Sequence, residues 1–384
     1  MEMKFKICID ASNIRAGGGV THLVELLKKA SPEEHKFNSV LLYAPSATLD
    51  LVENKDWLIK KLSPSVDKSI LYRIYWQCFK LASLAKAAKC NILFVPGGSD
   101  ISGFKPVVSM SQNLLPFDEQ QIKRYGFSLF TLKILLLRLT QSFSFKRANG
   151  VIFLTEYACK VVLSVTKKIT GTTVIIPHGV DPRFILAPRK QIEIKEYTNE
   201  NPFKVIYVST IDTYKNQWIV ADAVAELRKD NVPVILNLIG SPRSPAIEQL
   251  EDCLKKIDPM GDFVNYMGQI PFDKLHDYYK NSELMIFASS CENMPNILLE
   301  GMSAGLPIAC SNRGPMPEIL QDSGIYFDPE NVEEIVSALR KIIFSSDLRT
   351  EMSRSSFQLA KKFSWKRCAD ETFSFLSTVA KKTW

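Results

Sequence analysis

The sequence predicts an α/β protein built from two doubly wound, Rossmann-like parallel-sheet domains. Short apolar runs alternate with longer helical patterns along the whole chain. The runs are continuous rather than alternating, as expected for parallel strands that are buried on both faces. At 384 residues, the chain is also long enough to form two hydrophobic cores. Together these observations predict two units of strand–helix alternation.

The predicted strands are short apolar runs that end at turn or helix-start residues. In the first half they cover residues 4–10, 39–44, 91–96, 107–110 and 151–155, and in the second half residues 204–209, 234–239, 263–267, 284–288, 307–310 and 324–327. Amphipathic segments between them are predicted helices, such as residues 20–30, 216–229 and 332–344. Prolines and mixed charges crowd residues 177–202, so this stretch is predicted to link the two units.

Charge is unevenly divided along the chain, whose formal net charge is +7. Residues 1–180 hold 24 Lys and Arg against 13 Asp and Glu, whereas residues 181–384 hold 24 against 28. A basic first half suits an anionic substrate or surface, although a solvated surface without a partner accounts for it too. A nucleic-acid partner is not expected, because no aromatic–basic RNA motif accompanies the charge.

Cysteine spacing and hydropathy favour a cytoplasmic protein. The eight cysteines include no C-x-x-C pair, so neither a zinc site nor a disulfide framework is expected. The apolar run in residues 1–10 is too short for a signal peptide, and no run approaches the ~18 apolar residues of a spanning helix. Residues 127–147 combine an apolar body with basic side chains, which predicts peripheral contact with an anionic membrane. A buried helix of the first domain is the alternative.

Three consecutive glycines, Gly17, Gly18 and Gly19, follow the first predicted strand and open a helical pattern. Glycines there let the backbone approach a ligand, and a helix N-terminus favours an anion. The dinucleotide fingerprint G-x-G-x-x-G fails, because His22 stands where its third glycine would be. A phosphate or sugar near this loop is one reading, and a plain tight turn is the other. His22 itself is expected to be a packed or capped helix residue.

Two carboxylates flank the start of a predicted helix in the second half. Glu292 lies in the loop after the apolar run 284–288, and Glu300 follows with seven residues between them, inside the helix that begins near Pro295. Both would lie at the carboxyl edge of a parallel sheet, where open α/β folds bind ligands. Considered by spacing alone, a surface loop and a solvated helix position account for the two residues equally well.

The stretch 289–319 resembles the signature of glycosyltransferase family 4. Its E-x7-E motif matches Glu292 and Glu300, followed by Gly305-x-Pro307 and the turn at 314–318. The resemblance extends over most of the chain, in the family's order. It includes the glycine loop, an I-P-x-G-V-D stretch at 176–181, a donor loop at 209–216 and a Ser-Trp pair at 364–365.

This resemblance implies a GT-B fold, in which two Rossmann-like domains face a central cleft. It implies an acceptor domain at residues 1–180, a nucleotide-sugar donor domain at 181–355, and a C-terminal helix within 356–384 that packs back on the first domain. It also implies retaining transfer from a nucleoside diphosphate sugar, with no metal and no other cofactor. The sequence contains no D-x-D pair, which agrees with metal-independent transfer.

The resemblance also assigns roles to individual residues of the second domain. Glu300 would accept hydrogen bonds from the ribose hydroxyls, and Glu292 would hold the donor sugar close to its reacting face. Asn296 and Ile297 would offer backbone N–H groups to the sugar or diphosphate. Lys215 would neutralise the departing diphosphate, whose growing charge must be stabilised.

In the first domain, Gly18 and Gly19 would let the chain approach that diphosphate. Two positions depart from the family pattern. Thr210 stands where many members have an arginine, so that Arg243 or Arg313 would have to supply the missing charge. Gln112 or its neighbour Asn113 stands where many members have a histidine, which limits this position to hydrogen bonding.

The resemblance therefore implies a retaining glycosyltransferase that uses a GDP-, UDP- or dTDP-linked sugar and a glycan or lipid-linked acceptor. The family's common setting points to bacterial surface polysaccharide, such as O-antigen or capsule, with mannose as the first choice of sugar. A sugar-nucleotide-binding subunit with little or no activity is the alternative, given Thr210 and Gln112. A nicotinamide oxidoreductase is disfavoured by the failed glycine fingerprint.

Overall fold

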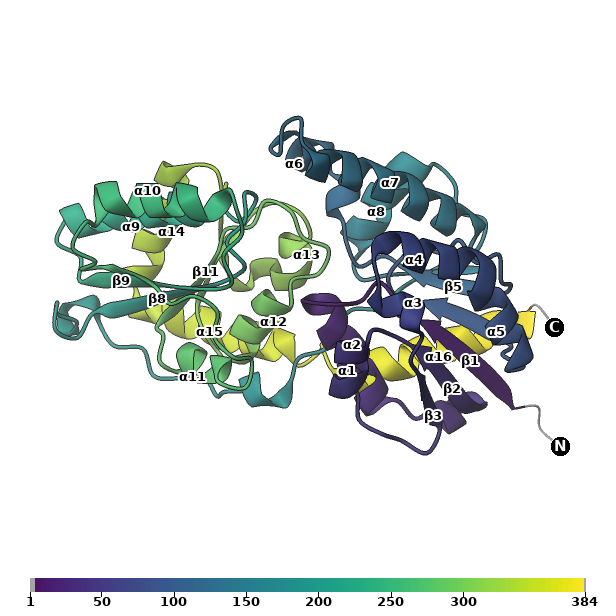
Figure 1. Cartoon of the computed structure of the whole chain (residues 1–384). Coiled ribbons are helices and arrows are strands. Elements are labelled where there is room, and N and C mark those ends of the chain that lie inside the picture. The colour runs from purple at the N-terminus through teal and green to yellow at the C-terminus, as the bar shows by residue number, and fades with distance from the viewer. Residues whose placement is uncertain (1–3, 383–384) are drawn as a thin grey trace. The chain divides into compact units, whose positions relative to one another are not determined.

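The computed structural model describes residues 4–382, which divide into two α/β units (Figure 1). Unit 1 comprises residues 4–122, 126–179 and 364–382. Unit 2 comprises residues 180–363 together with the tripeptide 123–125. None of the helices formed by residues 4–382 is both long enough and apolar enough to cross a membrane.

The sheet of unit 1 is parallel and, within the described residues, has seven strands in the order β3-β2-β1-β4-β5-β6-β7. These are β1 (Phe5–Asp10), β2 (Phe37–Tyr43), β3 (Leu58–Lys61), β4 (Ile92–Val95), β5 (Val107–Met110), β6 (Gly150–Phe153) and β7 (Thr172–Ile175). Strands β4, β5 and β6 are buried along their whole length, because helices cover both faces of the sheet.

Helices of the first part of the chain connect these strands. They are α1 (Gly18–Lys29), η1 (Pro32–His35), α2 (Ser46–Leu51), α3 (Pro64–Asp67), α4 (Ile70–Trp76), the π-helix η2 (Gln77–Leu81), α5 (Ala82–Ala87), η3 (Leu115–Phe117), α6 (Glu119–Lys123), α7 (Leu129–Arg147) and α8 (Glu156–Thr166). The last helix of the chain, α16 (Trp365–Lys382), also belongs to unit 1.

Unit 2 repeats the architecture with, among the described residues, six parallel strands in the order β10-β9-β8-β11-β12-β13. Its strands are β8 (Phe203–Val208), β9 (Val234–Ile239), β10 (Val264–Tyr266), β11 (Leu284–Phe287), β12 (Ile308–Ser311) and β13 (Ile325–Phe327). Its helices are η4 (Pro182–Phe184), η5 (Ile194–Glu196), α9 (Gln217–Lys229), α10 (Ala246–Ile257), α11 (Leu275–Lys280), α12 (Asn296–Ser303), α13 (Met316–Leu320), η6 (Gln321–Ser323), α14 (Val332–Ile343) and α15 (Ser346–Ala360).

Each sheet reverses its strand order once, which creates a topological switch point. In unit 1 the reversal falls between β1 and β4, and in unit 2 between β8 and β11. Loops that leave the carboxyl ends of neighbouring strands diverge at such a point and leave room for a ligand. The switch points therefore direct attention to the loop after β1 and to the loops after β8 and β11.

Every predicted strand overlaps a strand of the structure, whereas β3 and β7 were missed. Both missed strands form the edges of the unit 1 sheet. Their sequences, LIKK and TTVI, are largely exposed or half-buried. An edge strand needs no continuous apolar run, because it pairs on one side only and solvent reaches the other. The signal used for the buried strands is therefore absent from these two.

The boundary between the two units falls inside the stretch 177–202 that was predicted to link them, between Gly179 and Val180, and the rest of the stretch groups with unit 2. After Phe184 its residues are exposed or half-buried. The fully buried Arg349 holds part of it in place. Its guanidinium donates hydrogen bonds to Gln191 Oε1, at 3.2 Å, and to the carbonyl of Ile192. It also donates to Ile342 O, at 2.9 Å, at the end of α14. Arg349 thus connects Gln191 and Ile192 to the end of α14 by hydrogen bonds.

The C-terminal segment also differs from the expected boundary at residue 356. That position lies inside α15, and unit 2 continues to Phe363. From Ser364 onward the chain belongs to unit 1, where α16 contacts α1. On α16, Phe373 packs edge-on against Phe37 of β2, with ring centroids 6.2 Å apart. A Cβ at Gly150 would lie 2.8 Å from the ring of Phe375, so α16 packs directly on the sheet.

Candidate active site

A buried ion pair lies at the switch point of unit 2. Lys215, at the end of the loop after β8, donates a hydrogen bond from Nζ to Oε1 of Glu292, in the loop after β11. Their side chains are only 11% and 15% exposed. The backbone joins the same two loops, because the amide of Ser290 donates to the carbonyl of Tyr214 at 2.8 Å. Two of the predicted site residues are thus in direct contact.

Asn216 fixes the backbone next to this pair. It is fully buried and has a left-handed backbone with φ of 57°, a conformation that asparagine tolerates better than most residues. Its side-chain amide donates to Ala288 O at 2.8 Å and to Ser290 Oγ at 2.9 Å. Because Asn216 also immediately precedes α9, it holds the neighbouring Lys215 between the helix and the β11 loop.

The electrostatic environment keeps Lys215 charged. Burial alone would lower the pKa of its ammonium, but Glu292, together with Tyr207, more than offsets burial and raises this pKa. The hydroxyl of Tyr207 donates to the carbonyl of Lys215 at 2.6 Å. The ammonium also lies over the ring of Tyr214, 5.0 Å from its centroid. A cation is therefore held at the carboxyl end of the sheet across the physiological pH range.

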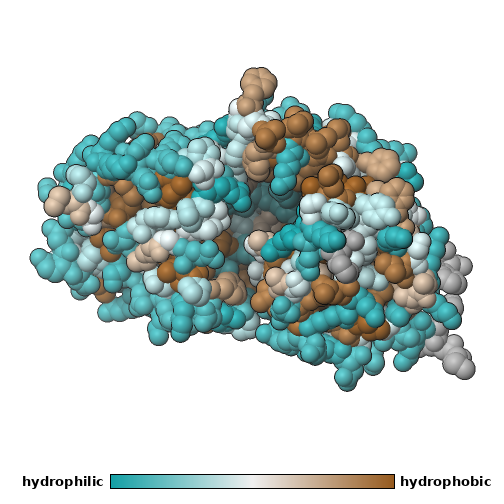
Figure 2. All heavy atoms as spheres, viewed as in Figure 1, coloured by the Kyte–Doolittle hydropathy of each residue, from teal (hydrophilic) through white to brown (hydrophobic). Residues whose placement is uncertain are grey.

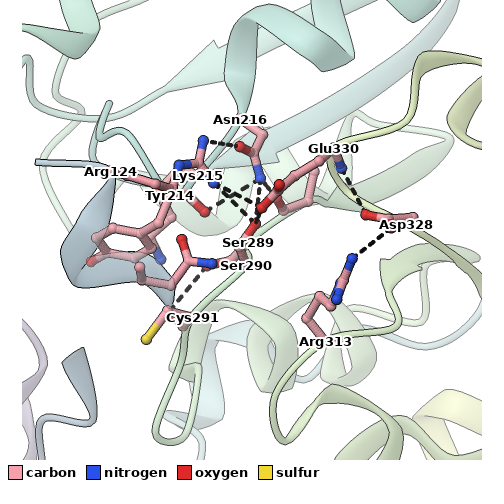
Figure 3. Close-up of polar contacts among 12 residues, drawn as sticks. Arg124, Tyr214, Lys215, Asn216, Ser289, Ser290, Cys291, Arg313, Asp328 and Glu330 are labelled. Carbon is pink, nitrogen blue, oxygen red and sulfur yellow. Dashed lines mark hydrogen bonds and ion pairs between the residues drawn. The ribbon is translucent and has the colours of Figure 1, made fainter. Parts of the chain in front are cut away.

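An arginine that the sequence analysis missed completes this cluster (Figure 3). Arg124 belongs to the tripeptide that groups with unit 2. It donates to Asn216 Oδ1 and to Glu330 Oε1, both at 2.9 Å. Glu330 also accepts a hydrogen bond from Ser290 Oγ at 2.8 Å. No motif surrounds Arg124 in the sequence, so that only the fold reveals its place.

The other cations considered for this site already have carboxylate partners. Arg243 pairs with Asp212 at 2.6 Å, and Arg313 pairs with Asp328 at the same distance. Thr210 contributes no charge, and its carbonyl accepts a hydrogen bond from Gln217 Nε2 at 2.9 Å. Either arginine would therefore have to leave its carboxylate before it could supply the charge that Thr210 lacks.

Helix α12 carries the remaining predicted residues of unit 2. Asn296 and Ile297 are its first two residues, and no side chain caps its N-terminus. Glu300 lies one turn further on and is only 6% exposed, so it is not a solvated helix position. It accepts a hydrogen bond from the hydroxyl of Tyr279 at 3.1 Å. Burial raises the pKa of Glu300 to about 8, despite this hydrogen bond.

A second cluster lies at the switch point of unit 1. Gly17 has a φ of 67°, which favours glycine, and α1 begins at Gly18. A Cβ on Gly19 would lie 3.0 Å from Oε1 of Gln112, so the glycine loop and Gln112 lie close together. Gln112 in turn donates from Nε2 to Nδ1 of His22 at 2.9 Å. The neighbouring Asn113 is exposed, which favours Gln112 as the residue at this position.

His22 is a fully buried, neutral partner of Gln112. Burial, with a further contribution from His178, holds the pKa of His22 well below its usual range. Its ring lies 4.8 Å from that of His178 and 5.9 Å from that of Trp365, measured between centroids. The expectation of a packed residue agrees with this burial, but no sequence motif indicates the contact with Gln112.

One group of side chains within residues 4–382 has the spacing of a metal site, away from both clusters. Glu34, His35 and Asp370 offer ligand atoms that lie within 4.8 Å of one another. Lys366 already pairs with Asp370 at 2.7 Å and lies 3.9 Å from Glu34. A lysine ammonium thus balances the two carboxylates, and we assign no metal to this group.

Comparison with solved structures identifies the class of fold. Sucrose-phosphate synthase from Thermosynechococcus elongatus superposes with a TM-score of 0.77 and 16% identity, over 99% of this chain and 100% of that chain. The Anabaena protein HepE, in complex with UDP-glucose, superposes with a TM-score of 0.71 and 16% identity, over 97% and 99% of the two chains. The molecule therefore has the GT-B fold, which confirms the predicted fold class.

Unit 2 also matches a family model. Residues 188–358 match the family described as glycosyl transferases group 1. Among curated relatives, O-antigen chain mannosyltransferase B of Escherichia coli is 29% identical over 112 residues, which cover 29% of this chain and 29% of that protein. The chain spans half or less of the length of several other curated relatives that it matches.

Proposed function

We propose that the protein is a retaining glycosyltransferase of family 4 that uses a nucleoside diphosphate sugar. The observation that carries the proposal is the buried ion pair of Lys215 and Glu292 at the switch point of unit 2. Both residues lie in the segment that matches the group 1 family. The UDP-glucose complex of HepE supports a nucleotide sugar as the donor.

The proposed reaction needs a cation where negative charge grows. The bond between the anomeric carbon and the diphosphate oxygen breaks, and the acceptor hydroxyl attacks the same face of the sugar. The departing diphosphate takes the proton of that hydroxyl, and Lys215 stabilises its growing charge. Because Lys215 supplies this charge, the proposed reaction requires no metal ion.

Glu292 is paired with the cation that the diphosphate needs. We expect donor binding to exchange these partners, so that the diphosphate takes Lys215 and Glu292 turns to hydroxyls of the donor sugar. The exchange keeps the buried ammonium paired throughout, which matters because an unpaired buried charge is costly. Glu292 thus acts by positioning the sugar and need not form a covalent bond to it.

The other predicted residues have supporting roles in this proposal. Glu300 accepts hydrogen bonds from the ribose, and the first amides of α12, at Asn296 and Ile297, bind the diphosphate or sugar. Gly18 and Gly19 give the backbone room to approach the diphosphate. Gln112, oriented by His22, contributes a hydrogen bond rather than a titrating base.

The similarity to an O-antigen mannosyltransferase supports a cytoplasmic role in bacterial surface polysaccharide, with a glycan or lipid-linked acceptor. Mannose is the first sugar to test. The deciding experiment incubates the purified protein with GDP-, UDP- and dTDP-sugars, with and without a chelator, and measures the release of nucleoside diphosphate. We expect release from one donor class, unaffected by the chelator. Release from no donor, with or without a candidate acceptor, would contradict the proposed activity.

A catalytically inactive sugar-nucleotide-binding subunit is the second candidate. It is favoured by the charge deficit at Thr210, since Arg243 and Arg313 are both bound to carboxylates. Calorimetry separates the two candidates. Tight binding of a nucleoside diphosphate without release from any sugar nucleotide would favour the inactive subunit over the enzyme.

A further inference from the structure

Helix α7 in unit 1 turns its apolar side chains toward solvent. Figure 2 shows apolar atoms gathered over this helix. The large exposed apolar residues of α7 and the turn before it are Phe127, Leu129, Leu132, Leu135, Leu136, Leu139 and Phe143. Leu129 and Leu139 are 87% and 67% exposed. Isolated exposed leucines are ordinary, but a continuous apolar helix face on the surface indicates a binding surface.

The buried side of α7 is partly polar, which fixes its orientation. Ser144 is buried, accepts from the amide of Asp100 at 2.8 Å and donates to the carbonyl of the same residue at 3.0 Å. Gln141 is buried against Gly98. A Cβ added to Gly98 would lie 2.9 Å from Nε2 of the Gln141 side chain. Rotating the helix to bury its leucines would break these contacts, so the leucine face stays outward.

Helix α4 extends the apolar surface. Its exposed residues, with one from η2, are Ile70, Leu71, Tyr72, Ile74, Tyr75 and Phe79. The connections from β3 to β4 and from β5 to β6 cross the sheet in the same direction, so right-handed crossovers place α4 and α7 on the same face. Trp76 of α4 and Phe145 of α7 belong to one hydrophobic cluster beneath them. We call the exposed sides of α4, η2 and α7 the α4–α7 face.

Within the two segments that carry the α4–α7 face, every charged side chain is basic. Residues 68–90 contain five Lys and Arg, residues 127–147 contain four, and neither segment contains an Asp or Glu. Arg138 pairs with Glu119, which lies outside both segments. Lys133, Lys146 and Arg147 are exposed on α7. A face that is both apolar and basic matches the interface of an anionic bilayer, which offers acyl chains and negative headgroups together.

We propose that the α4–α7 face docks unit 1 onto an anionic lipid surface. The leucines and aromatic residues enter the headgroup–acyl boundary, while the lysines and arginines extend along their stems to lipid phosphates. Ile134 and Phe145 remain buried in unit 1, so α7 presents only one side to the lipid. A second copy of the chain fits less well, because two such faces would oppose like charges. This inference concerns binding alone and does not depend on sugar transfer.

The test is co-sedimentation of the full chain with vesicles of neutral lipid and of rising anionic lipid content, at low and high salt. An apolar variant combines Leu132→Ser, Leu136→Ser and Leu139→Ser. Its matched control, Leu51→Ser, Met260→Ser and Phe344→Ser, removes exposed apolar residues from outside the face. Thermal melts verify that each variant is folded.

A basic variant, Lys133→Glu with Lys146→Glu, is paired with the control Lys361→Glu with Lys362→Glu in unit 2. Both double variants change the net charge of the protein by the same amount. A difference in vesicle binding between them therefore reports the position of the charge and not the net charge.

We expect the bound fraction to rise with anionic lipid content and to fall at high salt. The apolar and basic variants should each lose at least tenfold in affinity for anionic vesicles, while both controls bind as the natural chain does. Equal losses in variants and controls, or no binding of the natural chain at low salt, would overturn the proposal. Concentration-dependent dimerisation that the apolar variant abolishes, without vesicle binding, would assign the face to a second copy instead.

Discussion

The raised pKa of Glu300 predicts that Glu300→Gln stabilises unit 2 at alkaline pH. This carboxyl is buried, and its pKa is displaced from 4.5 to about 8. Between these values the native state binds a proton that the unfolded chain releases, so stability falls as the pH rises from 4.5 to 8 and levels off above. The full effect is about 5 kcal/mol, because each pKa unit corresponds to about 1.4 kcal/mol. Glutamine removes this penalty and still accepts the hydrogen bond of Tyr279.

Thermal melts at about pH 5.5 and pH 9 measure the effect, and the advantage of the glutamine variant should be about 3 kcal/mol larger at the higher pH. For a domain of this size, about 1 kcal/mol shifts the melting temperature by about 2–4 °C, so the change is easily resolved. Glu251→Gln, an exposed position on α10, is the control and should leave the pH profile unchanged. Parallel profiles for the natural chain and Glu300→Gln would refute the assignment of a buried, protonated carboxyl.

The same variant tests the proposed ribose contact. Above about pH 8, where Glu300 is ionised, replacing its charged acceptor by a neutral amide should weaken nucleoside diphosphate binding by about 1 kcal/mol, the difference between hydrogen bonds to charged and to neutral groups. Affinity of the natural chain should also rise relative to the variant as the pH passes through about 8, because the carboxylate is the better acceptor. The affinities of both proteins are measured by calorimetry at each pH. Their ratio is independent of the titration of the nucleotide, which is the same in both experiments. Equal affinities at every pH would remove Glu300 from the nucleotide site without affecting the stability argument.

Three further perturbations test other parts of the molecule. Lys215→Ala should lower turnover by about 10²–10³-fold, as removal of a charge-stabilising group does. Adding Thr210→Arg to this variant should partly restore turnover. Full activity of Lys215→Ala in the nucleotide-release assay would show that another residue neutralises the diphosphate. Gln112→His should remain active if this position supplies only a hydrogen bond, so complete inactivity of a folded variant would argue for a more specific role. Arg349→Met should destabilise unit 2 by about 3 kcal/mol or more, because buried carbonyls that lose their donor cost about 1–3 kcal/mol each; an unchanged urea midpoint would contradict this.

The central strands of both sheets could be predicted because burial on both faces imposes a continuous apolar sequence. The edge strands β3 and β7 could not, since one side of each reaches solvent and their sequences resemble loops. The attachment of Gln191 to unit 2 could not be predicted for a related reason. Its order comes from contacts with Arg349, about 160 residues away, and a local pattern does not record a partner that distant.

The candidate site was predictable to the level of its loops. The motifs identified the loops that hold Lys215 and Glu292, and the structure shows these two side chains in contact. It could not be foreseen that Arg124 would join them, because its partners Asn216 and Glu330 come from two distant segments of the chain. The pairing of Arg243 could not be foreseen either, since only the fold brings Asp212 within reach of it.

The packing of α16 on unit 1 also constrains how the chain can fold during its synthesis. The sheet of unit 1 is complete at Ile175, but the helix that covers α1 follows only after residues 180–363. At about 5–20 residues per second, a ribosome needs about 10–40 s to make that intervening stretch. During this interval Phe37 and His22 lack their aromatic neighbours on α16. Nascent unit 1 should therefore expose the surface that α16 covers until residues 364–382 have been made.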